Sequence, residues 1–79
     1  MDRKDIQAKL REIAREVFDD DSLEVSDSLG PDDVKAWDSL GHIRLISATE
    51  DAFKVTFTID EIEGLKSIGQ IGALVAARV

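Results

Sequence analysis

The residues best able to do chemistry in this chain are Asp38, Ser39 and His42, which lie within a stretch of five positions. Asp38 and Ser39 directly precede a helical apolar pattern, so the Ser39 hydroxyl is predicted to lie at the start of a helix. Unpaired backbone N–H groups and the positive end of the helix dipole favour a phosphate ester at such a point. The alternative is purely structural, because aspartate and serine are also common helix-capping residues.

A second possible role for Ser39 is that of a catalytic nucleophile. Such a serine needs a base within hydrogen-bond reach and a third group that orients the base. His42 is the only histidine in the chain and lies three residues later on the same predicted helix. A domain this small has no room for a substrate pocket of useful size. We therefore expect no enzymatic activity, and we expect His42 to face solvent or a partner protein.

The composition indicates one small domain spanning residues 1–79. Hydrophobic residues make up 43% of the chain, and only four of its residues are aromatic, which predicts a core of isoleucine, leucine and valine. The chain has no cysteine and one histidine, which excludes a disulfide and a structural zinc site. Stability must therefore come from apolar packing alone.

The net charge of −7 is concentrated in the middle of the chain, where residues 19–65 carry thirteen acidic and three basic side chains. Such a field repels nucleic acid and anionic membranes and steers encounters with basic protein surfaces, although it also serves solubility. No apolar run approaches the roughly 20 residues of a membrane span, and the first residues are charged. We expect a cytoplasmic protein without nucleic-acid binding or stable membrane insertion.

Four segments show helical signals. An amphipathic pattern covers residues 3–18, a second helix begins at Ser39 and runs to residue 53, a short helix covers residues 59–64, and a last helix follows Ser67. Residues 55–59 have strand propensity, but no other segment resembles a partner strand, so we expect an extended connection. Capping boxes are predicted for the last two helices, Thr58 with Glu61 and Ser67 with Gln70. The predicted fold is an all-α four-helix bundle of three main helices and one short helix.

The connection formed by residues 19–37 is long, and we expect it to be ordered. Apolar residues recur along it as potential anchors to the core, which a disordered linker would lack. These anchors are Leu23, Val25, Leu29, Val34 and Trp37. The acidic residues at its start do not match a calcium-binding loop, because the required glycine and glutamate positions are not filled.

The tetrapeptide Asp38-Ser39-Leu40-Gly41 has a second copy at residues 27–30. Only the copy at residues 38–41 is followed by an apolar pattern of helical period, so Ser39 rather than Ser28 is the candidate. The helix that follows has two different faces. We expect one face to be core, with Leu45, Ile46, Thr49, Ala52 and Phe53. The adjacent stripe, with Leu40, Ile43 and Ser47, should remain near the surface as a docking candidate.

The order of the elements, the acidic middle and the motif Asp38-Ser39-Leu40 resemble those of acyl carrier proteins of the phosphopantetheine-binding family. The resemblance implies that this chain is a discrete carrier without catalytic activity. Such proteins carry acyl groups as thioesters on a 4′-phosphopantetheine arm, which the resemblance places at Ser39, and they are not enzymes. A phosphopantetheinyl transferase with magnesium would transfer the arm from coenzyme A, with Asp38 at its metal. Leu40, Ile43, Arg44 and Ser47 would contact partners.

The resemblance also implies which partners a monomeric carrier would meet. These are an acyl-loading ligase or acyltransferase and downstream synthase or transferase enzymes. The chain departs from the common fatty-acid carrier pattern at Gly41, His42, Arg44 and Ser47, which makes the second helix less acidic than its flanks. We therefore expect a specialised fatty-acid, lipid or polyketide pathway. Gly41 is expected to allow close approach of a partner backbone.

Two alternatives to this function stay open at the level of the sequence. An aminoacyl or peptidyl carrier would use Ser39 in the same way, but such carriers usually have glycines before the serine, where this chain has Trp37 and Asp38. An unmodified helical interaction module would instead use the acidic middle to bind a basic partner, with Ser39 serving only as a helix cap.

Overall fold

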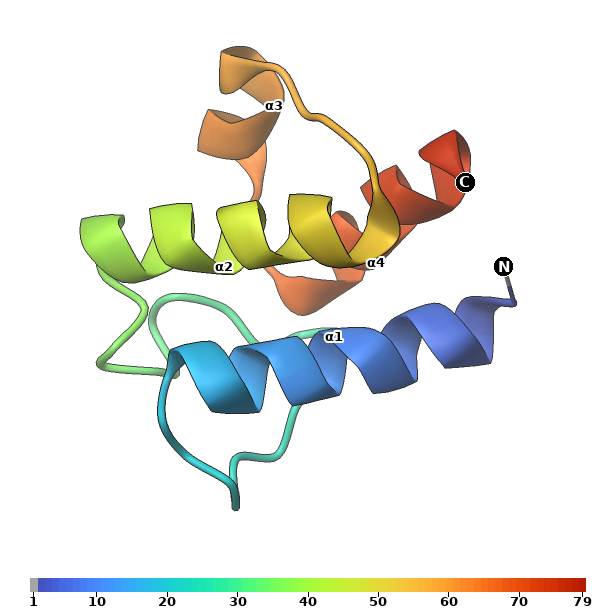
Figure 1. Cartoon of the computed structure of the whole chain (residues 1–79). Helices are drawn as coiled ribbons and strands as arrows, with labels where there is room; N and C mark the ends of the chain where they lie inside the picture. The colour runs from blue at the N-terminus through green and yellow to red at the C-terminus, as the bar shows by residue number, and fades with distance from the viewer. Residues whose placement is uncertain (1) are drawn as a thin grey trace.

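The structure, a computed structural model, describes residues 2–79. Its elements are α1 (Arg3–Val17), α2 (Ser39–Phe53), α3 (Ile59–Gly64) and α4 (Ile68–Arg78), and the described residues contain no strand. α1 and α2 run antiparallel, one above the other, while α3 stands across α2 (Figure 1). The predicted all-α bundle of three main helices and one short helix is therefore confirmed, as is the extended connection between α2 and α3.

One apolar core joins α1, α2 and α4, because the helical spacing of their aliphatic residues turns one side of each helix inward. α1 packs against both α2 and α4. Leu10, Leu45, Ile71 and Val75 are fully buried at its centre. On α2, the predicted core face is correct for Leu45, Ile46, Thr49 and Phe53, which are buried, while Ala52 is half-buried.

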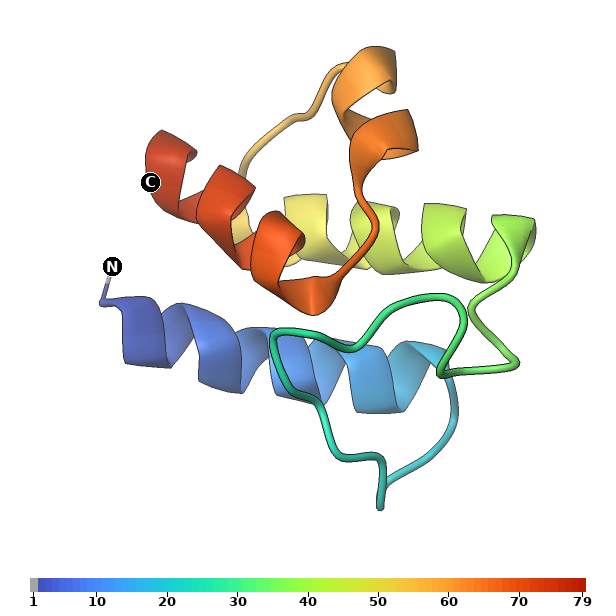
Figure 2. The same cartoon turned by 180° about the vertical axis from the view of Figure 1, so that it is seen from behind.

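The connection 19–37 is ordered and passes across α1 (Figure 2). The Arg15 side chain donates a hydrogen bond to the Leu23 carbonyl over 2.8 Å. Trp37 is only 3% exposed, and its ring packs against that of Phe18 with centroids 5.6 Å apart. The predicted order of this long connection is confirmed, and its apolar residues are the reason for it.

The second copy of the tetrapeptide, residues 27–30, lies in this connection and forms no helix. Its backbone instead serves the start of α4, because the carbonyls of Asp27 and Leu29 accept hydrogen bonds from Gly69 and Ile68 at 2.8 and 2.9 Å. These two N–H groups would otherwise be unpaired at a helix N-terminus. Residues 27–30 are thus a structural cap for α4.

The capping boxes are confirmed at α3 and only half correct at α4. Thr58 and Glu61 exchange the two reciprocal hydrogen bonds. At α4 the Ser67 hydroxyl accepts from the Gln70 N–H over 3.2 Å, but the Gln70 side chain accepts from Lys66 and not from Ser67. The residue pattern correctly predicts that Ser67 caps α4. Which backbone N–H the Gln70 side chain accepts from depends on the conformation of the residues before the helix, which the pattern does not give.

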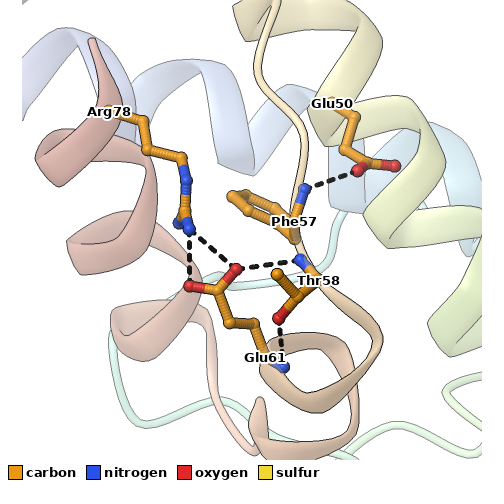
Figure 3. Close-up of polar contacts among 5 residues, drawn as sticks. All are labelled: Glu50, Phe57, Thr58, Glu61 and Arg78. Atoms are coloured by element: carbon orange, nitrogen blue, oxygen red, sulfur yellow. Dashed lines mark hydrogen bonds and ion pairs between the residues drawn. The ribbon is translucent and has the colours of Figure 1, made fainter.

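None of the residues of α3 is fully buried, and polar contacts help Ile62, which packs against the core, to hold this helix in place. Arg78 of α4 donates to both carboxylate oxygens of Glu61 at 2.6 and 2.7 Å (Figure 3). The same guanidinium lies 5.4 Å from the centroid of the Phe57 ring. The Phe57 N–H donates to the Glu50 carboxylate of α2 over 2.8 Å. The connection before α3 is thereby tied to α2, and α3 itself to the end of α4.

Gly41 lies where the end of the connection crosses the first turn of α2. A Cβ atom at Gly41 would come within 2.1 Å of the Ala36 carbonyl oxygen. The sequence-based expectation that this glycine admits the backbone of a partner is therefore wrong, because the backbone that approaches it belongs to the chain itself.

We predict that Gly41→Ala lowers the free energy of unfolding by about 2–3 kcal/mol, because a backbone oxygen cannot move aside as a flexible side chain can. Gly64→Ala is the matched control, since nothing lies within 4 Å of its added Cβ. This control should leave stability unchanged or raise it by up to about 1 kcal/mol. Urea unfolding of both variants checks the pair, and equal stabilities would contradict the close contact.

We also predict that Glu61 contributes to the pH dependence of stability. The Arg78 guanidinium, and next the Thr58 N–H, lower the pKa of Glu61 below its ordinary value of 4.5. A lowered pKa in the folded state adds stability above the unfolded value, and this stability is lost as the pH falls through the folded pKa. Glu61→Gln should therefore flatten the loss of thermal stability between about pH 5 and about pH 3. If thermal stability falls with pH in Glu61→Gln as it does in the wild type, the ion pair between Glu61 and Arg78 is not a cause of that loss.

Candidate functional site

The start of α2 is set by Asp38. This residue has extended backbone angles, its side chain accepts from the Gly41 N–H over 2.8 Å, and its carbonyl accepts from the His42 N–H over 2.8 Å. An aspartate cap of this kind ends the preceding connection and begins the helix at the next residue. Ser39 is consequently the first residue of α2, as predicted.

The Ser39 side chain is exposed at this helix start. Among residues 2–79 its hydroxyl makes no hydrogen bond, and the N–H groups of Ser39 and Leu40 have no acceptor. A groove of about 450 Å³ runs from Ser39 toward α3, with Trp37, Ile43 and Leu65 among its apolar lining residues. The hydroxyl therefore lies at the edge of a groove and beside two free backbone donors.

These residues fit a phosphate ester on Ser39. The two N–H groups and the positive end of the α2 dipole favour a negative charge there. Only one carboxylate oxygen of Asp38 is used by the cap, and the other makes no hydrogen bond within residues 2–79. Lys66 and the acidic Glu63 also line the groove. The site can thus hold a phosphorylated group whose remaining part extends along the groove or into solvent.

His42 is half-buried and is bonded on both ring nitrogens. The Trp37 indole N–H donates to His42 Nδ1 over 2.9 Å, and His42 Nε2 lies 2.8 Å from the Ile62 carbonyl oxygen of α3. An indole nitrogen only donates, so Nδ1 accepts and Nε2 carries the proton. The expectation that His42 faces solvent or a partner is wrong. With both nitrogens engaged, His42 is not a base for Ser39, which excludes the hydrolase arrangement.

Reasoning from the sequence missed this contact although a signal for it exists. A buried tryptophan needs an acceptor for its indole N–H, because an unpaired buried donor costs about 1–3 kcal/mol. His42 lies on the first turn of the helix that begins two residues after Trp37. The acceptor could therefore have been proposed, but the Ile62 carbonyl, which comes from a separate helix, could not.

The residues predicted to contact partners lie on the outer face of α2, next to Ser39. Leu40 and Ile43 are 61% and 54% exposed, so two large apolar side chains are accessible to a partner on this face. Arg44 and Ser47 are exposed on the same helix. The structure thus brings the attachment candidate and this exposed stripe together on one helix.

Within residues 2–79 no group of three or more histidine, cysteine, aspartate or glutamate side chains is placed to hold a metal ion. Across the same part of the chain, every helix is too short or too polar to span a membrane.

Comparison with known proteins agrees with this geometry. The family model described as the phosphopantetheine attachment site matches residues 8–75. The structure is similar to a holo acyl carrier protein from Geobacter metallireducens, solved by solution NMR, with 38% sequence identity and a TM-score of 0.84. The match covers 91% of this chain and 83% of that chain. A comparison with curated proteins found no match. The chain therefore belongs to the phosphopantetheine-binding family of acyl carrier proteins, which carry cargo on a covalent 4′-phosphopantetheine arm and are not enzymes.

Proposed function

We propose that Ser39 accepts the 4′-phosphopantetheine arm and that residues 1–79 form one discrete, monomeric, cytoplasmic carrier domain. The observation that carries this proposal is the exposed, unbonded hydroxyl of Ser39 at the first residue of α2. Ser28, in the other copy of the tetrapeptide, is also exposed, but it lies in a connection whose backbone caps α4.

In the loading reaction the Ser39 oxygen forms a bond to the phosphorus that bears the pantetheine group of coenzyme A. The phosphoanhydride bond breaks, adenosine 3′,5′-bisphosphate leaves, and a base of the transferase takes the serine proton. The free carboxylate oxygen of Asp38 is available to the magnesium ion that the transferase supplies. The chain has no cysteine, so the thiol that holds cargo as a thioester comes with the arm.

A tethered cargo explains why a chain without catalytic groups is useful. An arm of roughly 20 Å raises the effective concentration of the cargo at each enzyme that docks on the carrier. Docking must be weak so that partners can exchange. Leu40, Ile43, Arg44 and Ser47 provide a small surface for such contacts with a loading ligase or acyltransferase and with downstream synthases or transferases.

The charge of this surface supports a specialised fatty-acid, lipid or polyketide pathway. Arg44 places a positive charge five residues after Ser39, within a chain whose net charge is −7. Charged groups at the edge of an interface act mainly on the association rate and on the choice of partner. The partners that fit this carrier therefore have docking surfaces that tolerate a cation at this point.

Loading at Ser39 is tested by intact mass after incubation with coenzyme A, magnesium and a broad-specificity phosphopantetheinyl transferase. The wild-type protein should gain one phosphopantetheine, and Ser39→Ala should gain none. Ser28→Ala is the matched control, since it alters the other copy of the motif and should load as the wild type does. An unmodified wild type, or a loaded Ser39→Ala variant, would overturn the assignment.

The role of Arg44 is tested by reversing its charge. Arg44→Glu should raise kcat/KM for loading by a transferase with a basic docking surface, by about two- to tenfold at low salt, with the difference shrinking at high salt. Lys54→Glu makes the same charge change at the far end of α2, where Lys54 is exposed. We expect a smaller effect there. Identical responses of the two variants at every ionic strength would remove Arg44 from the interface.

A further inference from the structure

α3 closes the side of the bundle that lies nearest to Ser39. The groove beside Ser39 reaches from α2 to Ile62 and Glu63 of α3. No residue of α3 is fully buried, and Ile62 is the residue of this helix that packs, partly buried, against the core, so apolar packing holds α3 less firmly than the three main helices. The position of α3 therefore depends on its polar contacts as well, and we define the line along which α2 and α3 meet as the seam.

Two contacts hold α3, one on each side. The ion pair between Glu61 and Arg78, neither of which lines the groove, ties it to α4. The hydrogen bond from His42 Nε2 to the Ile62 carbonyl ties it to α2 across the seam. The Ile62 carbonyl also accepts from the Leu65 N–H at 3.3 Å, so His42 supplies the shorter of its two hydrogen bonds.

The bond across the seam is held in one arrangement by Trp37. The indole and imidazole rings are close to parallel, with 18° between their planes, and the indole N–H donates to Nδ1. This donation leaves the proton on Nε2, which is the atom that faces Ile62. Trp37 is buried, so the donor is fixed in position. Trp37, His42 and Ile62 thus form a relay of two hydrogen bonds that ends on α3.

The relay lies between Ser39 and the core. His42 is three residues after Ser39, about one helical turn, and Ile46, one further turn along α2, is 2% exposed. His42 lines the same groove as Ser39 and Ile62, so an acyl chain that entered the core along this groove from an arm at Ser39 would part α2 from α3 at His42. Parting them would leave the Ile62 carbonyl without its shorter hydrogen bond and His42 Nε2 without an acceptor.

We propose that His42 is a specificity-determining residue that keeps the seam closed, so that the acyl cargo of this carrier stays outside the core. This inference rests on the proposed attachment at Ser39. In this proposal His42 positions α3 against α2. Whether the cargo stays exposed to partner enzymes then depends on the hydrogen bond between His42 Nε2 and the Ile62 carbonyl.

The test compares carriers loaded with butyryl, hexanoyl and octanoyl arms from the corresponding acyl-coenzyme A, with isotope-labelled methyl groups observed by NMR. In the wild type the Ile46 and Ile71 methyl shifts should not change with acyl length. In His42→Asn they should move progressively with length, because asparagine can replace Nδ1 but is too short to reach Ile62. His42→Gln should resemble the wild type, because glutamine places an amide donor where Nε2 lies.

Val17→Ala is the control for lost stability, since Val17 is half-buried at the end of α1 and does not line the groove. It should show no dependence on acyl length. Length-dependent shifts in the wild type would overturn the proposal, and so would a His42→Asn variant whose shifts stay constant. Should His42→Asn not fold, the wild-type series still tests whether the cargo stays outside the core, and length-dependent shifts in His42→Gln would contradict the role given to the donor at Nε2.

The imidazole nitrogen shifts of the unloaded wild type provide a readout that does not depend on loading. They should identify the neutral form protonated at Nε2, and a proton on Nδ1 at neutral pH would overturn the relay. Intact mass of each acyl form separates the two proposals. A chain that gains no acyl arm contradicts the attachment at Ser39, whereas a loaded chain with length-dependent core shifts contradicts only the role of His42.

Discussion

The site depends on the close approach of the Ala36 carbonyl to the first turn of α2, which only a glycine at position 41 permits. Because the connection can lie flat against this turn, Trp37 reaches a buried position and Asp38 is left at the helix cap. The helix must then begin at Ser39. One contact between two backbone segments therefore fixes where the hydroxyl lies, without any side chain holding the hydroxyl itself.

The helices of the bundle are held together by two kinds of interaction. α1, α2 and α4 are joined by buried aliphatic side chains, whose contribution grows with the apolar area removed from water. α3 is joined by hydrogen bonds, an ion pair and the partly buried Ile62, and each polar contact has a small net effect in an exposed setting. The part of the molecule nearest the groove is thus also the part whose position a single substitution can change.

Helix positions could be predicted from the sequence because periodicity and capping residues are local signals. Ser39 was separated from Ser28 by the pattern that follows each of them. The function of Gly41 and the contact of His42 with Ile62 could not be predicted, since they depend on Ala36 and Ile62, which the fold brings to α2. The same reason explains the half-formed capping box at Gln70, whose side chain meets Lys66.

The cap that residues 27–30 place on α4 has a consequence for folding. The hydrogen bonds from Ile68 and Gly69 to Leu29 and Asp27 join segments about forty residues apart in the chain. Contacts of such long sequence separation carry a loop-closure cost that local contacts do not. Because each segment satisfies hydrogen bonds of the other, we expect the long connection and the start of α4 to order and open together, so that cleavage of the connection by a protease would report the undocking of the C-terminal helix.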